Sequence, residues 1–552
     1  MPPTPMNVQD MGADTGESKR SEGGPSTATM INLNNLTYNL EPDLSVVTNA
    51  TFKQHFFQQT EYSNNQRATC ILNTGADYVD TRRSWVVFTL VPPDAATDPV
   101  TFGPMGSVLN LINRVTVASR SGDELSRTRR LNLCKASLLP YKMDSEWWKS
   151  TGSSLGQNAT LYDGTKGADG QTGSLEPMRF VIPLYLLSDL FGYGRFLPSM
   201  LTSGMRIEIE WEQPDVAFTP MLGKETIVTD AAKGSGWDTY TIKDLHINAR
   251  SIQLTDAVQR HLNELSATNG LEIVYTDWET TEQAKVAGTQ INLEVRKASS
   301  RALKAYGKIR YSEAKEGTRD SMVSAPFSSV QHQWQLGSLY FPHQPIKASK
   351  DTKPFSASQE SYLHLLDSFT PKSGIAKSAM PLRGPGIEKL PGAVVTRTAD
   401  FTMTSAGSFA DTKSGDHIVF FNTSDAGYAK HIPIIREVKS KTDANVVVLT
   451  EDFTVENGGT IVYGRPYKLR ESYHDREPTS FGVKTNFQNN ASLLACCLER
   501  SALFNLSGIP INNSRVLLLR ATTYDTADKD VTIFLQYVKL ARVFLNNCEV
   551  EQ

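Results

Sequence analysis

The chain has 552 residues, of which 39% are hydrophobic and 21% charged, and its mean hydropathy is −0.33. This length is too great for a single core, so about two to four domains are expected, and no apolar run approaches the roughly 20 residues that a membrane-spanning helix needs. The net charge of −3 argues against a protein whose main task is to neutralise nucleic-acid phosphates.

The N-terminal sequence MPPTPMNVQD has no basic region leading into an apolar one. It therefore does not predict a secretory signal, and we expect a soluble protein made inside a cell. Residues 1–30 are rich in Pro, Gly, Ser and Thr, have almost no large apolar side chains and carry charges that nearly cancel. This composition predicts a mobile arm, placed at residues 1–43, that does not contact a genome.

The five cysteines form no Cys-x-x-Cys pair. An odd number suits a reducing compartment better than a disulfide framework. The adjacent Cys496 and Cys497 are predicted to be small buried hydrophobic residues on an apolar helix, and redox or metal chemistry is the alternative. The other three are Cys70, Cys134 and Cys548.

Short β-branched and aromatic segments separated by Pro and Gly turns begin at residue 52. They predict strands at 52–58, 84–91 and 111–118. Residues 131–148 change to helical spacing. The segment 152–177 is dense in Gly, Asp, Ser and Thr, which predicts an exposed functional loop.

The stretch 180–211 reads as a strand, two short apolar helical turns, a Ser-Gly break and an amphipathic strand. A looser copy of this unit follows near the C-terminus, with alternation at 481–487, helical spacing at 493–506 and a strand at 516–519. A β-rich unit that occurs twice, far apart in the sequence, predicts two copies of one domain.

The remaining elements fit this duplication. Residues 239–254 predict a closing strand with a bend, as do residues 531–545, and residues 256–265 predict a linker helix. Residues 356–369 predict a capped amphipathic helix that corresponds to the helix of the first half. Second-half strands are predicted at 271–278, 291–295, 302–311, 333–341 and 516–521.

The second half also contains a segment without counterpart, at about 384–473. We interpret it as a small β-barrel or hairpin cluster inserted into a loop, because insertions are tolerated where chain ends lie close together at a surface. Asn457-Gly458 is its hairpin signal. Its strand-like patterns lie at 416–422, 432–438, 446–449 and 461–463.

Many short antiparallel strands with few helices predict an all-β fold built of β-sandwiches. With roughly eight strands a copy, the prediction is two eight-stranded jelly rolls, with short helices in the loops and an inserted small β domain. The expected domains are a flexible arm at 1–43, jelly rolls at 44–253 and 268–552, a linker helix at 254–267 and the inserted β domain at 384–475.

Four segments carry a resemblance to a known family. They resemble segments of the double jelly-roll major capsid proteins of polinton-like viruses and virophages. The four segments are FVIPL at 180–184, FLPSMLTSGMRIEIEW at 196–211, WQLGSLYFPHQPI at 334–346 and SGIPINNSRVLLL at 507–519. This group belongs with the hexon-like capsomers of adenovirus and giant viruses. The inserted domain departs from the pattern, and no family role is carried onto it.

The resemblance implies a non-enzymatic major capsid protein of a double-stranded DNA virus. Homotrimers would present six similar walls and tile an icosahedral shell. The loop at 152–177 and the inserted domain would be outward towers, and residues 1–30 an inner arm. Implied partners are neighbouring trimers, penton and minor capsid proteins, and a host receptor at the towers, without strong nucleic-acid binding. The expected location is the virion, after synthesis inside the host cell.

The sequence GSSLG at 152–156, centred on Ser154, matches the nucleophile elbow of hydrolases. That motif needs a strand before it and a helix after it. Here a predicted helix precedes the motif and a loop follows it, so we interpret the match as chance. No catalytic residue, cofactor or metal ligand is predicted.

Other polar candidates also have plain structural interpretations. His332 and His343 flank strand-like sequence, and we expect satisfied structural or interface roles because no metal-ligand spacing is present. Asp163 and Asp169 lack the alternating ligands of a calcium loop. Asn158-Ala159-Thr160 matches the N-glycosylation triplet, but such a triplet is modified only in proteins that enter the secretory route.

The basic cluster Arg127, Arg129 and Arg130 predicts an interface salt bridge or a solvated face, with phosphate binding as the alternative. A second group is aromatic, and packing in the core or at a trimer interface is expected for it. Its members are Trp147, Trp148, Tyr193 and Phe196.

Two other functions stay open. One is a cytosolic two-sandwich hydrolase or carbohydrate-binding protein, because fold alone does not fix function. The other is a spike or penton-type attachment protein whose tower binds a receptor. A cleft with paired carboxylates or a metal cluster would favour the first, and sizing of the purified protein separates all three.

Overall fold

The structure is a computed structural model. The residues that it describes are 46–93, 100–102, 106–156, 177–222, 226–227, 239–312, 331–347 and 359–369, short segments between 387 and 469, and 492–499, 508–512, 515–523, 528–544 and 548–551. The predicted arm at 1–43 lies outside this range, as do most of the loop at 152–177 and the alternating segment 481–487.

Two four-stranded paths form the first half of the chain. One runs β1-β12-β4-β8 and the other β3-β9-β6-β7, and all pairs are antiparallel. If the strands are lettered B to I in chain order, the paths read B-I-D-G and C-H-E-F, the strand order of a jelly roll. The strands are β1 (Val47–Phe56), β3 (Arg67–Ile71), β4 (Tyr78–Val91), β6 (Ile112–Ala118), β7 (Glu124–Arg129), β8 (Met178–Pro183), β9 (Arg206–Trp211) and β12 (Thr241–Leu254).

The second half repeats this strand order. Its paths run β13-β29-β15-β26 and β14-β28-β16-β17, which again read B-I-D-G and C-H-E-F. The duplication is therefore real, and the predicted double jelly roll is confirmed. The strands are β13 (Leu271–Val286), β14 (Gln290–Val295), β15 (Ser299–Tyr311), β16 (Gln331–Leu336), β17 (Leu339–Lys347), β26 (Leu494–Cys497), β28 (Leu517–Thr522) and β29 (Lys529–Val543).

Shorter strands add to these sheets. Three pair with strands of the two rolls, and three others form a small sheet of their own in the order β11-β10-β5. The six are β2 (Glu61–Ser63), β27 (Ile509–Ile511), β30 (Cys548–Glu551), β5 (Val100–Thr101), β10 (Thr219–Leu222) and β11 (Thr226–Ile227).

Strand β9 shows why the sequence forms these sheets. Ile207 and Ile209 are fully buried, while Arg206 is exposed on the opposite face, because successive side chains of a strand point to opposite faces. The alternation predicted for this segment is confirmed. Strand β29 is buried at nearly every position, because it has the core of its own roll on one face and the first roll on the other.

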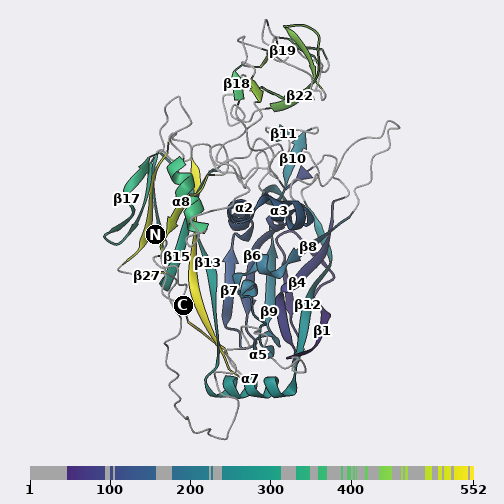
Figure 1. Ribbon diagram of the computed structural model, residues 1–552, viewed down its shortest axis with the longest axis vertical. Helices are drawn as coiled ribbons and strands as arrows, with labels where there is room; N and C mark the ends of the chain where they lie inside the picture. The colour runs from purple at the N-terminus through teal and green to yellow at the C-terminus, as the bar shows by residue number, and fades with distance from the viewer. Residues whose placement is uncertain are drawn as a thin grey trace, which may run out of the picture.

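The two rolls stand side by side with their strands along the long axis of the molecule (Figure 1). The predicted linker helix is confirmed as α7 (Asp256–Thr268), which lies across the lower end, whereas α2, α3 and α8 lie at the upper end. Among the described helices, none combines the length and hydropathy that a bilayer-spanning segment needs. The longer helices besides α7 are α2 (Leu131–Lys142) and α8 (Gln359–Phe369).

Single helical turns complete the described connections. They are α3 (Ser145–Trp147), α4 (Leu184–Leu187), α5 (Ser199–Thr202), α6 (Pro214–Ala217), η1 (Val108–Leu111), η2 (Trp148–Gly152) and η3 (Asp189–Gly192).

Strands between residues 387 and 469 pair with one another in the order β18-β25-β21-β22-β23-β20-β19-β24, and no pairing with a strand of either roll is found among the described residues. They lie above the upper end of the rolls (Figure 1). The hairpin signal at 457–458 lies outside the described residues. The strands are β18 (Ile387–Lys389), β19 (Val395–Ala399), β20 (Thr402–Thr404), β21 (His417–Phe420), β22 (Ile434–Lys441), β23 (Val446–Leu449), β24 (Val462–Tyr463) and β25 (Tyr467–Leu469).

Two sequence predictions in the second roll are wrong. The segment predicted to be helical from residue 493 begins as strand β26, and the single strand predicted at 333–341 is the hairpin β16–β17. Strand β26 is buried on both faces, so its apolar residues do not alternate and mimic helical spacing. The hairpin turns at Gly337, whose φ of 58° lies in the left-handed region.

Candidate functional site

The first candidate is the seam between the rolls, where β13 and β29 of the second roll face β7 and α2 of the first. Buried residues from both sides, such as Trp211 and Tyr275, belong to one continuous hydrophobic core. Aromatic rings join the rolls near the upper end, where Phe369 of α8 stacks 6.4 Å from Tyr141 of α2 and 5.3 Å from Tyr306 of β15. The two rolls therefore form a single packed unit.

A buried ion pair lies in the middle of this seam. Lys539 Nζ is 2.7 Å from Asp277 Oδ2, and the two side chains are only 1% and 2% exposed. Ser126 of β7 donates a hydrogen bond to Asp277 Oδ1 at 2.8 Å, and the Tyr275 hydroxyl donates to the carbonyl of Leu125 at 2.5 Å. The hydrogen bonds of Ser126 and Tyr275 cross the seam and fix the register of the second roll against the first, whereas the ion pair itself lies within the second roll.

The basic cluster before α2 reaches the same seam. Arg130 Nε lies 3.2 Å from Glu282 Oε2 of β13, and Arg130 Nη1 lies 3.4 Å from Glu212 Oε2. Arg127 pairs with Glu124 at 3.2 Å on its own strand, and the carbonyl of Arg129 accepts a hydrogen bond from Thr280 Oγ1 at 2.8 Å. The predicted interface salt bridge is confirmed for Arg130, at the interface between the rolls.

The second candidate is the outer edge of the first roll. Strand β1 ends its path, and no strand pairs with its outer edge among the described residues. Phe52 and Phe56 are 51% and 68% exposed, and the Phe52 ring lies 4.9 Å from the ring of Trp85. A ten-residue edge strand with exposed aromatic rings is a surface that natural proteins usually cover with a partner.

The second roll ends in a similar edge on the opposite flank. Strand β17 pairs with β16 on one side only among the described residues, and its Leu339 and Tyr340 are 45% and 39% exposed. In Figure 1, β1 lies at the right flank of the molecule and β17 at the left flank. The two uncovered edges therefore face in different directions.

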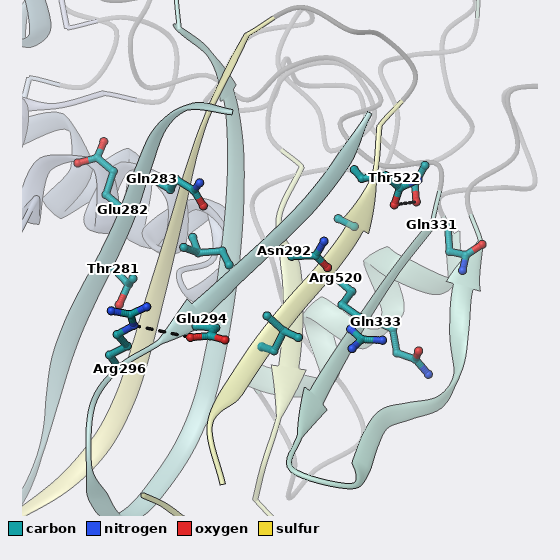
Figure 2. Close-up of a pocket in the computed structure, with 14 residues that line it drawn as sticks. Thr281, Glu282, Gln283, Asn292, Glu294, Arg296, Gln331, Gln333, Arg520 and Thr522 are labelled. Atoms are coloured by element: carbon teal, nitrogen blue, oxygen red, sulfur yellow. Dashed lines mark hydrogen bonds and ion pairs between the residues drawn. The ribbon is translucent and has the colours of Figure 1, made fainter. Parts of the chain in front are cut away.

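A polar trough lies beside the β17 edge, over the outer face of β14, β28 and β16 (Figure 2). Its volume is about 980 Å³. Asn292, Arg520 and Gln333 stand opposite one another on the three strands, and Arg520 has no carboxylate within 4 Å among the described residues. An ion pair between Arg296 Nε and Glu294 Oε2, 3.6 Å apart, lies at the other side. The trough offers hydrogen-bonding groups next to an apolar edge, the composition of an interface rim.

The GSSLG segment does not form a nucleophile elbow. It begins at the end of η2, and the hydroxyl of Ser154 donates to the carbonyl of Thr151 at 2.7 Å while that of Ser153 donates to the carbonyl of Ser150 at 2.7 Å. A helical turn therefore takes the place of the strand that an elbow requires.

The histidine expectation is partly wrong. His332 is buried on the inner face of β16, and its Nε2 has no hydrogen-bond partner among the described residues, so within these residues it is not satisfied as expected. Burial lowers the pKa of His332 to about 3. His343 is exposed on β17. No group of three or more His, Cys, Asp or Glu side chains that could hold a metal ion occurs within the described ranges.

The cysteines are free thiols, and all except the half-buried Cys497 are buried. Burial raises the pKa of Cys70 to about 12 and that of Cys548 to about 11, so neither thiol is activated. Cys496 and Cys497 lie on strand β26 and not on the predicted helix. Asp163, Asp169 and Asn158 lie outside the described residues.

The predicted aromatic group divides by burial. Trp148 is buried, Trp147 and Tyr193 are half-buried against the core, and Phe196 is 41% exposed. Sequence reasoning missed Asp277, Lys539 and the exposed rings of β1. The available signal was the position of Asp277, which alternation places on the same face of the strand as Ile273 and Tyr275.

No protein-family model matches the sequence, and no curated protein is similar to it. Three solved structures similar to the chain are the PBCV-1 virus capsid, the Faustovirus major capsid protein and the mavirus major capsid protein. The PBCV-1 capsid protein is 9% identical, with a TM-score of 0.44 over 94% of this chain and 100% of that one. The Faustovirus protein is 10% identical, with a TM-score of 0.46 over 94% of each chain. The mavirus protein is 10% identical, with a TM-score of 0.42 over 99% of this chain and 97% of that one.

Proposed function

We propose that the chain is a structural capsid protein that associates head to tail into a closed homotrimer, which tiles the shell of a virus. The observation that carries the proposal is a pair of edge strands, β1 and β17, on opposite flanks of two upright rolls, whose outer edges pair with no other described strand (Figure 1). The role is structural and involves no catalysis.

The position of the two edges determines the type of assembly. A two-fold dimer joins identical patches, whereas two different patches on opposite flanks join head to tail and close into a ring when the rotation permits. In a ring of three, the exposed Phe56 of one copy would meet the Leu339 and Tyr340 region of the next. Two similar rolls per copy would then give the trimer six similar walls.

The proposal extends to the domains of the chain. Rolls at 44–253 and 268–552, joined by a linker helix at 254–267, would form the wall, and the inserted domain at 384–475 would be an outward tower. Residues 1–43 would serve as an arm on the inner side. Neighbouring trimers, penton and minor capsid proteins are the proposed partners, with a host receptor at the tower. The proposed location is the virion, after synthesis in the host cell.

Sizing of the purified full-length protein by light scattering, followed by electron microscopy, tests the proposal. We expect a mass three times that of the chain and hexagonal arrays of trimers at high protein concentration. A monomer at micromolar concentration that never forms arrays would overturn it. A monomer that binds or cleaves glycans would favour the carbohydrate-active alternative, and isolated trimers that bind cells without tiling would favour an attachment protein.

A further inference from the structure

A second cavity lies in the seam between the rolls, apart from the two flanks. Its volume is about 420 Å³, within the range of sites for small ligands. The first roll contributes Arg82, Lys142 and Tyr185 to its lining, and the second roll contributes Thr276 and Gln536. A ligand in this cavity would contact both rolls at once.

Asp189 also lines the cavity, but its carboxylate is already satisfied. Its Oδ2 accepts hydrogen bonds from Thr276 Oγ1 at 2.8 Å, Trp278 Nε1 at 2.9 Å and Gln536 Nε2 at 3.3 Å. Its Oδ1 lies 3.6 Å from Lys135 Nζ. Lys135 is therefore the ion-pair partner of Asp189, and the other cations of the cavity make no contact within 4 Å with its carboxylate.

Those other cations are Arg82 and Lys142. Neither has a carboxylate within 4 Å among the described residues, although Lys142 lies in the field of Asp189. Surrounding protein lowers the pKa of Lys142 by desolvation, and Lys135 and Lys304 act in the same direction. Lys142 is nevertheless exposed to solvent. Arg82 is exposed as well, so both cations can present their charge to a ligand that enters from solution.

The backbone around Arg82 places this cation in the cavity. Asp80 pairs with Arg250 and Trp85 with Asn248, so four residues of β4 stand opposite a single residue of β12 and form a bulge, a feature that re-aims side chains. Thr81 Oγ1 donates to the carbonyl of Phe191 at 2.7 Å and ties the bulge to the neighbouring loop.

Gly194 supplies the space for the guanidinium group. Its φ is +86°, and a Cβ at this position would lie 2.6 Å from a guanidinium nitrogen of Arg82. The left-handed conformation strains any side chain there, whereas the contact alone would be relieved by a shift of the flexible guanidinium end. The β-bulge therefore places Arg82, and Gly194 leaves room for its guanidinium group.

We propose that this seam cavity binds a tetrahedral oxyanion of the phosphate type. Arg82 would donate two parallel hydrogen bonds to it, Lys142 would supply a point charge, and the Tyr185 hydroxyl would donate a further bond. The phosphate group can be inorganic phosphate or part of a larger molecule such as a nucleotide. The bound anion would join the two rolls and raise the stability of the folded chain in proportion to its concentration.

The test is a titration of the purified full-length protein with inorganic phosphate, and in parallel with ADP, at constant ionic strength and with sodium chloride as the reference. We expect saturable binding by calorimetry and a rise in melting temperature. Arg82→Gln and Lys142→Gln should each weaken binding about tenfold or more, because each loses a charge-assisted hydrogen bond to the anion. If inorganic phosphate and ADP bind with equal affinity, the cavity recognises the phosphate group alone. If ADP binds more tightly, the cavity also contacts the nucleoside part of ADP.

Arg83→Gln is the matched control. Arg83 neighbours Arg82 in the same bulge, but its side chain is 66% exposed, lies 3.9 Å from Asp80 and does not line the cavity. This variant should bind phosphate as the unaltered protein does. If the variants at Arg82 or Lys142 fail to fold, tungstate soaked into the unaltered protein should give density between these two side chains. Absence of saturable binding, or equal losses in the Arg83 variant, would overturn the proposal.

Discussion

The ion pair of Lys539 and Asp277 is the most deeply buried charge pair described at the seam, with 1% and 2% of the two side chains exposed. Replacing only one partner leaves a buried charge without compensation, which costs about 3–5 kcal/mol. We therefore expect Asp277→Asn to lower the free energy of unfolding by about this amount in urea denaturation. The double variant Asp277→Asn with Lys539→Met should recover most of the loss, and a loss below about 1 kcal/mol in the single variant would contradict this account.

His332 makes the stability of the second roll depend on pH. Burial lowers its folded-state pKa to about 3, whereas an unfolded histidine titrates near pH 6.5. Between these values the unfolded state binds more protons, so the contribution of this group is intact above about pH 6.5 and is lost as the pH falls toward 3. In this range the free energy of unfolding falls by about 1.4 kcal/mol for each pH unit that the pH is lowered.

The comparison of the unaltered protein with His332→Gln isolates this histidine. Stability measured in urea from pH 7 to pH 4 should fall less steeply in the variant. His55 also has a pKa lowered by burial and contributes equally to both proteins, so parallel curves for the two proteins would argue against a neutral buried His332.

At the scale of the element, strand β1 has the clearest role in association. Phe56 is 68% exposed, so Phe56→Lys should leave the folded monomer within about 0.5 kcal/mol of the unaltered protein. In an interface the same lysine would be buried without a partner, and we expect each contact to weaken by at least about 2 kcal/mol. Light scattering should then show a folded monomer, whose melting temperature falls only by the stabilisation that association supplies.

Phe196→Lys serves as the control for the substitution in β1, because Phe196 is an exposed phenylalanine outside both edge strands. It should associate as the unaltered protein does. Loss of association in this variant as well would mean that the lysine acts through general solubility and not through the β1 edge.

The inserted strands form a separate element. Their described pairings are with one another only, and closing a shorter loop in their place costs little entropy. Replacing residues 384–475 by a short Gly-Ser linker should therefore keep the trimer and change the free energy of unfolding of the rolls by about 1 kcal/mol or less. The same light-scattering and urea measurements check this, and an unfolded product would show that the rolls need the insert.

Elements with clear periodicity could be predicted from the sequence, and those buried on both faces could not. The alternation of β9 and the apolar face of α7 each point to one type of element. In β26, Leu494 and Cys496 are buried and so is Ala495 between them, so the segment has no period that separates strand from helix. The seam was not predictable either, since Asp277 and Lys539 lie 262 positions apart and only the strand pairing of the second roll joins them.

At the scale of the whole molecule, the two flanks should be complementary to each other and not to themselves. A variant with Phe56→Lys loses the β1 flank and keeps the β17 flank, and a variant with Tyr340→Lys does the reverse. Each should be monomeric alone, and their mixture should form a heterodimer through the one intact pair of flanks. Light scattering of the mixture measures this, and two species that stay monomeric together would contradict head-to-tail association.

The overall duplication could be predicted from sequence because the order of strand and turn signals repeats, whereas the exposed edges could not. Phe52 and Phe56 look like core residues in the sequence, since burial depends on which strand ends a sheet, and strand order is a property of the folded chain.

The hydrophobic core of the first roll continues onto residues of β13 and β29, while the interior of the second roll is a separate cluster. This continuity has a mechanical consequence. Bending the chain between its halves would expose the rings of Tyr275 and Phe534 to water, so the double roll should behave as one stiff plate without an internal hinge. In any closed shell built from such rigid subunits, the curvature would have to arise at the contacts between the subunits.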